Sequence, residues 1–282
     1  MTKVSMEVIK ILREQTGVGL TRCKEALEAS NGDLDQAILY LRKMGLASAG
    51  KKESRETKEG TIGVASDHYG IALIEVNVET DFVANNKKFR GLVEDLCKEL
   101  LLNKATDVSQ FLNATYSQDS SLTIDQLKAL FIQSLGENIQ VKRLLYIKKE
   151  PSHSYGIYSH SGGKVVSLVT ISGSNKEESL ARDFAMHVAA TSPLYVSESM
   201  VPESVIQQER EIAFNQVKNK PNAVIEKIVA GKLAAFFVEN CLLDQQFIKD
   251  PSKSIKEILK EKSNNLEETL NITSFLRWKV GE

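Results

Sequence analysis

Apolar side chains in the first 50 residues recur at the spacing of short amphipathic helices. The first helix carries Val4, Val8, Ile11 and Leu12 on one face and ends at Gly17 and Gly19. A second helix is predicted over about 21–32 and a third from residue 33 to about Gly45. Residues 1–50 are therefore interpreted as a three-helix binding module, too small for a catalytic cleft.

A charged stretch, residues 51–60, separates this module from a mixed pattern of helices and strands. Its sequence, KKESRETKEG, is typical of a solvated linker or an extended helix end. The alternation over 71–78 predicts a half-buried strand. Another strand is predicted over 139–147, and a helix over 123–135. A long amphipathic helix is predicted from the spacing of Phe89, Leu92, Val93, Leu96 and Leu100.

A similar order of elements follows in the second half of the chain. Residues 155–160 and 165–171 are strand-like, a helix carries Leu180, Phe184 and Val188, and a closing strand is predicted over 272–280. The two closing strands begin alike, with Asn-Ile at 138–139 and at 271–272. The repeated order predicts two related α+β subdomains.

Residues 202–242 form an insertion in the second half with a helical pattern that is broken at Pro221. We expect an antiparallel helical hairpin, since Pro221 fits the first turn of the second arm. The expected seam consists of Val205, Ile212 and Val217 on the first arm, and of Val224, Ile228, Gly231, Ala235 and Val238 on the second. Such a hairpin serves as a contact arm or a dimerisation element, and the alternative is an ordinary part of a helical core.

The fold class predicted from these patterns is α+β, with four segments. These are the three-helix module 1–50, the linker 51–60, a first core subdomain 61–150, and a second subdomain 151–282 that includes the hairpin. A length of 282 residues agrees with two domains and a small third module.

Charge and cysteine content narrow the function classes. Lys and Arg number 36 and Asp and Glu 37, so the chain lacks the basic excess of a typical nucleic-acid binder, and we expect no direct nucleic-acid partner. Cys23, Cys97 and Cys241 are far apart in sequence, so neither a zinc site nor a disulfide framework is predicted. We expect three reduced, mostly buried thiols.

The chain carries none of the sequence signatures of common catalytic sites. P-loop, dinucleotide, nucleophile-elbow and HExxH motifs are missing, and we expect no metal, no cofactor and no catalytic residue. His187 lies on the apolar face of its helix, which is typical of a hydrogen-bonded core histidine. An enzyme with an unrecognised site around His187 or His160 stays open as an alternative.

The start of the chain predicts a cytoplasmic location without membrane association. Charged residues interrupt the region where a signal peptide would be apolar, and acidic residues argue against a transit peptide. No apolar run approaches the roughly 18 residues that a membrane-spanning helix requires.

Residues 80–83, TDFV, mark the turn from a strand into a helix. In one interpretation Thr80 or Asp81 caps the helix while Phe82 and Val83 anchor it to the core. In the other, Phe82 is an exposed apolar wedge at the tip of a rigid strand-turn-helix. The pattern of residues alone leaves both open.

Two long segments resemble the signatures of the elongation factor Ts family. They are LREQTGVGLTRCKEAL at 12–27 and EVNVETDFVAN at 75–85. The resemblance continues through GENI at 136–139, AMHVAA at 185–190 and residues 275–282, and so covers essentially the whole chain.

The resemblance implies a fold and a function. The fold would be a ubiquitin-associated-like three-helix domain, a core of two related α+β subdomains and an inserted antiparallel coiled coil. The function would be guanine-nucleotide exchange on the GTPase elongation factor Tu, without making or breaking a bond. Asp81 and Phe82 would disturb the Mg²⁺ site of Tu, while Thr80 and Val83 hold the turn.

The resemblance also implies further Tu contacts, at Arg13, Leu20, Leu135 and His160. Some family members continue past the closing strand with another helical module. We therefore expect the N-terminal module here to provide more of the binding to the GTPase domain. The rival from a different class is a ubiquitin-associated-like adaptor that binds a helical partner without driving exchange.

Overall fold

The computed structural model describes residues 4–217, 221–266 and 269–282, a mixture of helices and strands of the α+β class. It divides into two compact units, each described by itself. The first unit comprises Met1–Lys149, Gly162–Lys164 and Lys279–Glu282, and the second comprises Glu150–Ser161 and Val165–Trp278.

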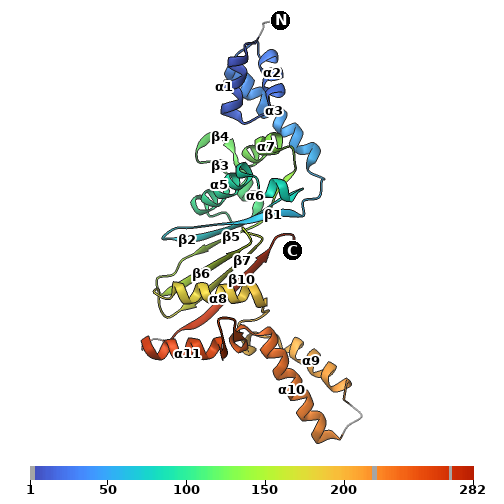
Figure 1. Cartoon of the computed structure of the whole chain (residues 1–282), viewed down its shortest axis with the longest axis vertical. Coiled ribbons are helices and arrows are strands. Elements are labelled where there is room, and N and C mark those ends of the chain that lie inside the picture. Colours follow the sequence, from blue (N-terminus) through green and yellow to red (C-terminus); the bar gives the residue numbers. More distant parts are fainter. Residues whose placement is uncertain (1–3, 218–220, 267–268) are drawn as a thin grey trace. The chain divides into compact units, whose positions relative to one another are not determined.

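Three helices begin the first unit: α1 (Met6–Thr16), α2 (Leu20–Ala29) and α3 (Leu34–Lys52) (Figure 1). Gly17 ends α1 in the left-handed conformation, with φ of 67°. Their shared core contains Ile9, Leu12, Val18, Cys23, Ala26, Leu27, Ala37 and Leu41.

Helix α3 extends to Lys52, so the predicted stop near Gly45 is wrong. Gly45 lies inside the helix, where a Cβ atom would come within 3.0 Å of the Gln133 side chain on α7 (Ile124–Leu135). This glycine permits a close approach between two helices instead of ending one of them.

An antiparallel sheet in the order β1-β2-β5 forms the base of the first unit. Its strands are β1 (Glu59–Ser66), β2 (Gly70–Val78) and β5 (Ile139–Lys148). The central strand β2 is buried along its whole length. Apolar residues of α5 (Lys87–Asn103), among them Phe89, Leu92, Leu96 and Leu100, pack in the same core as those of β2. The charged stretch 51–60 ends inside the sheet, because β1 begins at Glu59.

The second unit contains a sheet in the order β10-β7-β6, from β6 (His153–His160), β7 (Val165–Ser172) and β10 (Asn271–Lys279). Helix α8 (Glu178–Thr191) packs on β6 and β7. Gly156 makes this packing possible, since a Cβ atom there would lie 1.9 Å from the Ala181 carbonyl carbon.

Each unit also contains a small hairpin followed by a helix of 12 residues. The sequence patterns predicted the first of these helices, over 123–135, but neither of the hairpins nor the second helix. In the first unit, α6 (Val108–Asn113) leads into β3 (Thr115–Tyr116), β4 (Asp119–Thr123) and α7. In the second, η2 (Leu242–Asp244) leads into β8 (Gln246–Phe247), β9 (Asp250–Ser254) and α11 (Ile255–Leu266).

These two hairpins share their register and their turn chemistry. Tyr116 pairs with Asp119, and Phe247 pairs with Asp250. Each aspartate accepts hydrogen bonds from the backbone and the hydroxyl of the serine two residues later, Ser121 or Ser252. The sequences YSQDSSLTI and FIKDPSKSI carry this signal at the same spacing.

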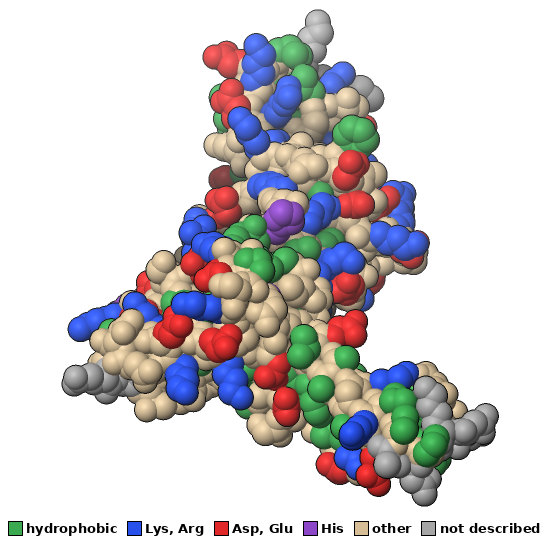
Figure 2. All heavy atoms as spheres, turned by 60° about the horizontal axis from the view of Figure 1, so that its bottom comes forward, with side chains coloured by type: hydrophobic (Ala, Val, Ile, Leu, Met, Phe, Trp, Pro, Cys, Tyr) green, Lys and Arg blue, Asp and Glu red, His purple; other side chains and the backbone are tan. Residues whose placement is uncertain are grey.

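Helices α9 (Glu203–Asn215) and α10 (Asn222–Asn240) pack on each other in the second unit, after the short η1 (Glu198–Met200). Their seam contains Ala213, Val217, Ile225, Val229 and Leu233, with Ile206, Ile228 and Phe237 at its margin. Most of the predicted seam on α10 is wrong, since Val224, Gly231, Ala235 and Val238 are exposed. Figure 2 shows hydrophobic side chains on the outer surface of this helical pair.

Among the residues that the structure describes, no helix is both long enough and apolar enough to span a bilayer.

Candidate functional site

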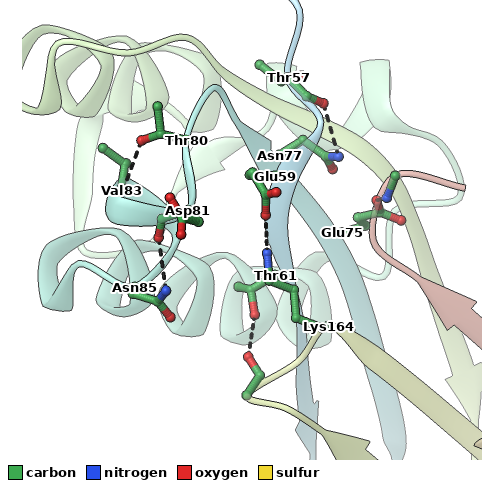
Figure 3. Close-up of polar contacts among 12 residues, drawn as sticks. Thr57, Glu59, Thr61, Glu75, Asn77, Thr80, Asp81, Val83, Asn85 and Lys164 are labelled. Carbon is green, nitrogen blue, oxygen red and sulfur yellow. Dashed lines mark hydrogen bonds and ion pairs between the residues drawn. The ribbon is translucent and has the colours of Figure 1, made fainter.

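The turn after β2 leads into α4 (Asp81–Ala84), a single helical turn. Thr80 is extended, with φ −127° and ψ 155°, and its hydroxyl oxygen accepts a hydrogen bond from the Val83 backbone N–H at 3.4 Å (Figure 3). At the other end, the Asn85 side chain donates to the Asp81 carbonyl oxygen at 3.0 Å. Thr80 therefore caps the helix, as one of the two predicted candidates.

Phe82 projects into solvent from this turn, with 84% of its surface exposed. Val83 packs against the core of the first unit and Ala84 is fully buried. The interpretation in which Phe82 anchors the helix to the core is therefore wrong, while that role does fall to Val83. Burial of a phenylalanine side chain is worth about 1.5–3 kcal/mol, so a partner that covers Phe82 would gain a substantial part of its binding energy there.

A second loop, residues 136–138, holds this turn from the side. The Glu137 carboxylate accepts from the Thr80 backbone N–H at 3.0 Å and from the Thr80 hydroxyl at 2.6 Å. In the opposite direction, the Glu79 carboxylate accepts from the Asn138 backbone N–H at 2.7 Å. Each loop thus supplies a carboxylate to a backbone donor of the other. We refer to Glu79, Thr80, Glu137 and Asn138 as the crossed clamp.

Residues at the end of α3 and just after it support the crossed clamp. The Lys52 ammonium donates to the Gly136 carbonyl oxygen at 2.5 Å, and burial lowers the Lys52 pKa. The Asn138 side chain donates to the carbonyl oxygen of Arg55 at 3.0 Å. Gly136 ends α7 in the left-handed conformation, so both the chain direction and the hydrogen bonds at this loop are fixed.

The sheet that leads into the turn is held by polar contacts of buried and partly exposed side chains (Figure 3). Glu75 on β2 is fully buried, and its carboxylate accepts from the Arg143 guanidinium at 2.7 Å and from the Gly281 backbone N–H at 3.0 Å. The Thr61 hydroxyl donates to the Gly162 carbonyl oxygen at 2.8 Å, and Lys164 pairs with Glu59. Because β2 leads directly into Thr80, these contacts fix the base from which the turn projects.

The loop of the first signature meets the same part of the first unit. The Gly17 carbonyl oxygen accepts from the Ser134 hydroxyl at 2.8 Å, one residue before Leu135 at the end of α7. Arg13 is exposed on α1, Leu20 begins α2 with 38% of its surface exposed, and Leu135 is half-buried. The structure therefore brings the loop between Arg13 and Leu20 close to Leu135.

His160 is the last residue of β6 and belongs to the second unit. Its ring is exposed and stacks on Tyr158, with 6.1 Å between ring centroids. The Tyr158 hydroxyl and His160 Nδ1 lie 3.2 Å apart, within hydrogen-bonding distance.

Comparison of the sequence with known proteins identifies the family of the chain. The family model described as elongation factor TS matches residues 79–282. The chain is 51% identical over 281 residues to the elongation factor Ts of Chlamydia muridarum (strain MoPn / Nigg), with 100% of both chains covered. The chain belongs to the elongation factor Ts family. Identity is 49% over 282 residues to the elongation factor Ts of Protochlamydia amoebophila (strain UWE25), again with 100% of both chains covered.

Membership in the elongation factor Ts family gives the chain a role in translation elongation. The family match begins at Glu79, so it includes the whole crossed clamp and the exposed Phe82. Glu79 and Glu137 were not assigned a role from the sequence. Their signal is weak, because each is a single acid before a polar residue and only the fold brings the two loops together.

The histidine on α8 is a core residue, as its pattern predicted. His187 is fully buried, with Nε2 2.9 Å from Gln245 Oε1 and Nδ1 3.3 Å from the Ile248 backbone nitrogen. Burial lowers its pKa.

The three thiols are free and buried. Burial raises the pKa of Cys97 to about 12 and that of Cys241 to about 11, so both are protonated at neutral pH and poorly nucleophilic. Within the described residues, no three His, Cys, Asp or Glu side chains are grouped to hold a metal ion.

Proposed function

We propose that this chain is a guanine-nucleotide exchange factor that binds elongation factor Tu in its GDP form and promotes GDP release. The observation that carries the proposal is the exposure of Phe82, 84%, on a turn where Thr80 caps the helix and Val83 and Ala84 pack on the core. A large apolar side chain held in solvent on a rigid base is a suitable hot spot for a protein partner.

The mechanism follows from the chemistry of the Tu nucleotide site. Mg²⁺ requires near-octahedral coordination, so small displacements of the groups around it weaken nucleotide binding. Phe82 would act as an apolar wedge beside that site, and Asp81 would disturb the polar groups around the ion. Thr80 and Val83 keep the turn rigid through the cap bond of 3.4 Å and the packing of Val83 on the core.

Release and rebinding are linked thermodynamically. If the chain weakens nucleotide binding to Tu, then nucleotide weakens the binding of the chain by the same factor. GTP would therefore displace the chain after GDP has left. No bond is made or broken, so the protein would not be an enzyme in that sense.

Further Tu contacts are proposed at Arg13, Leu20, Leu135 and His160. Arg13 and His160 are exposed, Leu20 is 38% exposed and Leu135 is half-buried, so a partner could reach all four. These contacts, together with the Phe82 turn, would maintain binding to Tu when a single contact is altered.

The proposed layout has four parts. Residues 1–50 form a ubiquitin-associated-like domain and 51–60 link it to two related α+β subdomains, 61–150 and 151–282. The shared hairpin-helix pattern of the two units supports their relation. The α9–α10 pair within 202–242 would be an antiparallel coiled coil. The protein would act in the cytoplasm, where translation takes place.

The experiment measures release of labelled GDP from Tu. Phe82→Ala should lower the maximal accelerated rate about tenfold or more, while unfolding stability stays near that of the wild type because the side chain is exposed. Tyr69→Ala is the matched control: Tyr69 is another aromatic residue, 69% exposed, in the β1–β2 turn, and its variant should exchange normally.

Three outcomes would contradict the proposal in part or in whole. Unchanged GDP release with the intact protein would overturn the exchange function, and binding without acceleration would favour the adaptor alternative. Full activity of a folded Phe82→Ala variant would overturn the role of the wedge.

A further inference from the structure

We infer that Glu137 is a positioning residue for nucleotide exchange: its carboxylate fixes the Thr80 cap and, through it, the direction in which Phe82 projects. The inference rests on the proposed function and deepens it. Glu137 need not touch the partner for this role, because it acts through the turn.

The geometry of the Thr80 contacts supports this role. Glu137 receives both hydrogen-bond donors of Thr80, the backbone N–H at 3.0 Å and the hydroxyl at 2.6 Å. Because the hydroxyl proton is directed to Glu137, the oxygen presents a lone pair to the Val83 N–H. Hydrogen bonds to a carboxylate are about twice as strong as neutral ones, so the orientation of the cap depends strongly on this single side chain.

Helix α4 is too short to fix its own orientation relative to the core. It has 4 residues, far fewer than the roughly 12–15 that an isolated helix needs to be even marginally stable. Within the described part of the chain, the residues of this helix that reach the core are Val83 and Ala84, which lie after Phe82 in the chain. The orientation of the side before Phe82 must therefore come from Thr80 and from what binds Thr80.

The loop that presents Glu137 is itself rigid. The Lys52 ammonium binds the Gly136 carbonyl oxygen, and the Asn138 side chain binds the carbonyl oxygens of Glu53 and Arg55 at 3.3 and 3.0 Å. The Glu79–Asn138 contact closes the crossed clamp from the other side. Glu137 thus connects Thr80, at the base of the Phe82 turn, to a loop that is held in place by the C-terminal ends of α3 and α7.

The test compares GDP release from Tu across increasing concentrations of the full-length wild type, Glu137→Gln and Glu137→Ala. Glu137→Ala should lower the maximal release rate about tenfold while changing the half-saturating concentration less than about twofold, because other contacts maintain binding. Glu137→Gln has one acceptor oxygen in place of two, so its maximal release rate should lie between those of the wild type and Glu137→Ala. Glu94→Ala removes an exposed acid from α5 and is the charge-matched control, expected to behave as wild type.

A double variant separates positioning from general destabilisation. If Glu137 acts through Phe82, then Phe82→Ala combined with Glu137→Ala should release GDP no more slowly than Phe82→Ala alone. A further, multiplicative loss in the double variant would overturn the inference, as would an unchanged maximal rate in Glu137→Ala. If the wild type itself fails to accelerate release, the proposed function fails first, so the two failures are distinguishable.

Discussion

His187 shows how a single buried residue ties stability to pH. Its imidazole is fully enclosed in the core of the second unit, and burial lowers its pKa below the ordinary value of 6.5. The folded protein therefore keeps the ring neutral at a pH where the unfolded chain already binds a proton. Since the unfolded state then binds more protons, stability is complete above about pH 6.5 and falls as the pH decreases further.

We predict that His187→Gln reduces this pH dependence. Between pH 7 and pH 5 the thermal unfolding temperature of the wild type should fall, and the fall should be smaller in the variant, which has no imidazole to protonate. His68→Gln removes an exposed ring from the β1–β2 turn and should keep the wild-type profile. Equal pH dependence in His187→Gln and wild type would show that other groups cause the effect.

Residues 80–83 show what could be predicted at the residue scale. Residue type and position predict a helix cap at Thr80 or Asp81, and the structure shows that Thr80 is the cap. The exposure of Phe82 does not follow, because Phe82 and Val83 are adjacent apolar residues and only the orientation of the turn decides which of them faces the core. That orientation depends on Glu137, which lies 57 positions away in sequence.

Helix α10 shows the corresponding limit at the scale of an element. Its existence was predicted, but its buried face was not, and Pro221 directly precedes the helix instead of lying in its first turn as predicted. Apolar residues surround the helix on nearly every side, so periodicity cannot select a face. Contact with α9 selects the row Ile225, Val229, Leu233 and Phe237, with a spacing of four. The prediction that α3 ends near Gly45 was wrong for a similar reason, since the role of this glycine is determined by its contact with the neighbouring helix α7.

Two glycines in different elements should respond to alanine in opposite directions. Gly156→Ala places a methyl group 1.9 Å from the backbone of α8, so β6 and α8 must separate, at a cost of about 3 kcal/mol in unfolding free energy. Gly231→Ala in α10 meets nothing within 4 Å and should add about 1 kcal/mol through helix propensity. Urea unfolding of both variants checks this prediction, and a Gly156→Ala protein as stable as wild type would contradict the packing of β6 on α8.

The whole molecule combines two units that each contain a three-stranded sheet and a hairpin-helix pattern. Most of the main strands and helices were predicted from the sequence because their apolar periodicity is strong, but β1 and α11 were not. The short hairpins were missed because strands of two and five residues are too short to show a period. Membership in the elongation factor Ts family agrees with the resemblance of the two signatures, which contain Gly17 and Phe82.

The proposed exchange function requires that the chain acts repeatedly on Tu without being consumed. The most direct measurement adds the full-length chain, at about one-hundredth of the Tu concentration, to Tu loaded with labelled GDP in the presence of excess GTP. We expect all of the label to be released much faster than at the intrinsic rate, because GTP displaces the chain from each Tu molecule in turn. Release at the intrinsic rate, or release limited to one GDP per added chain, would contradict it.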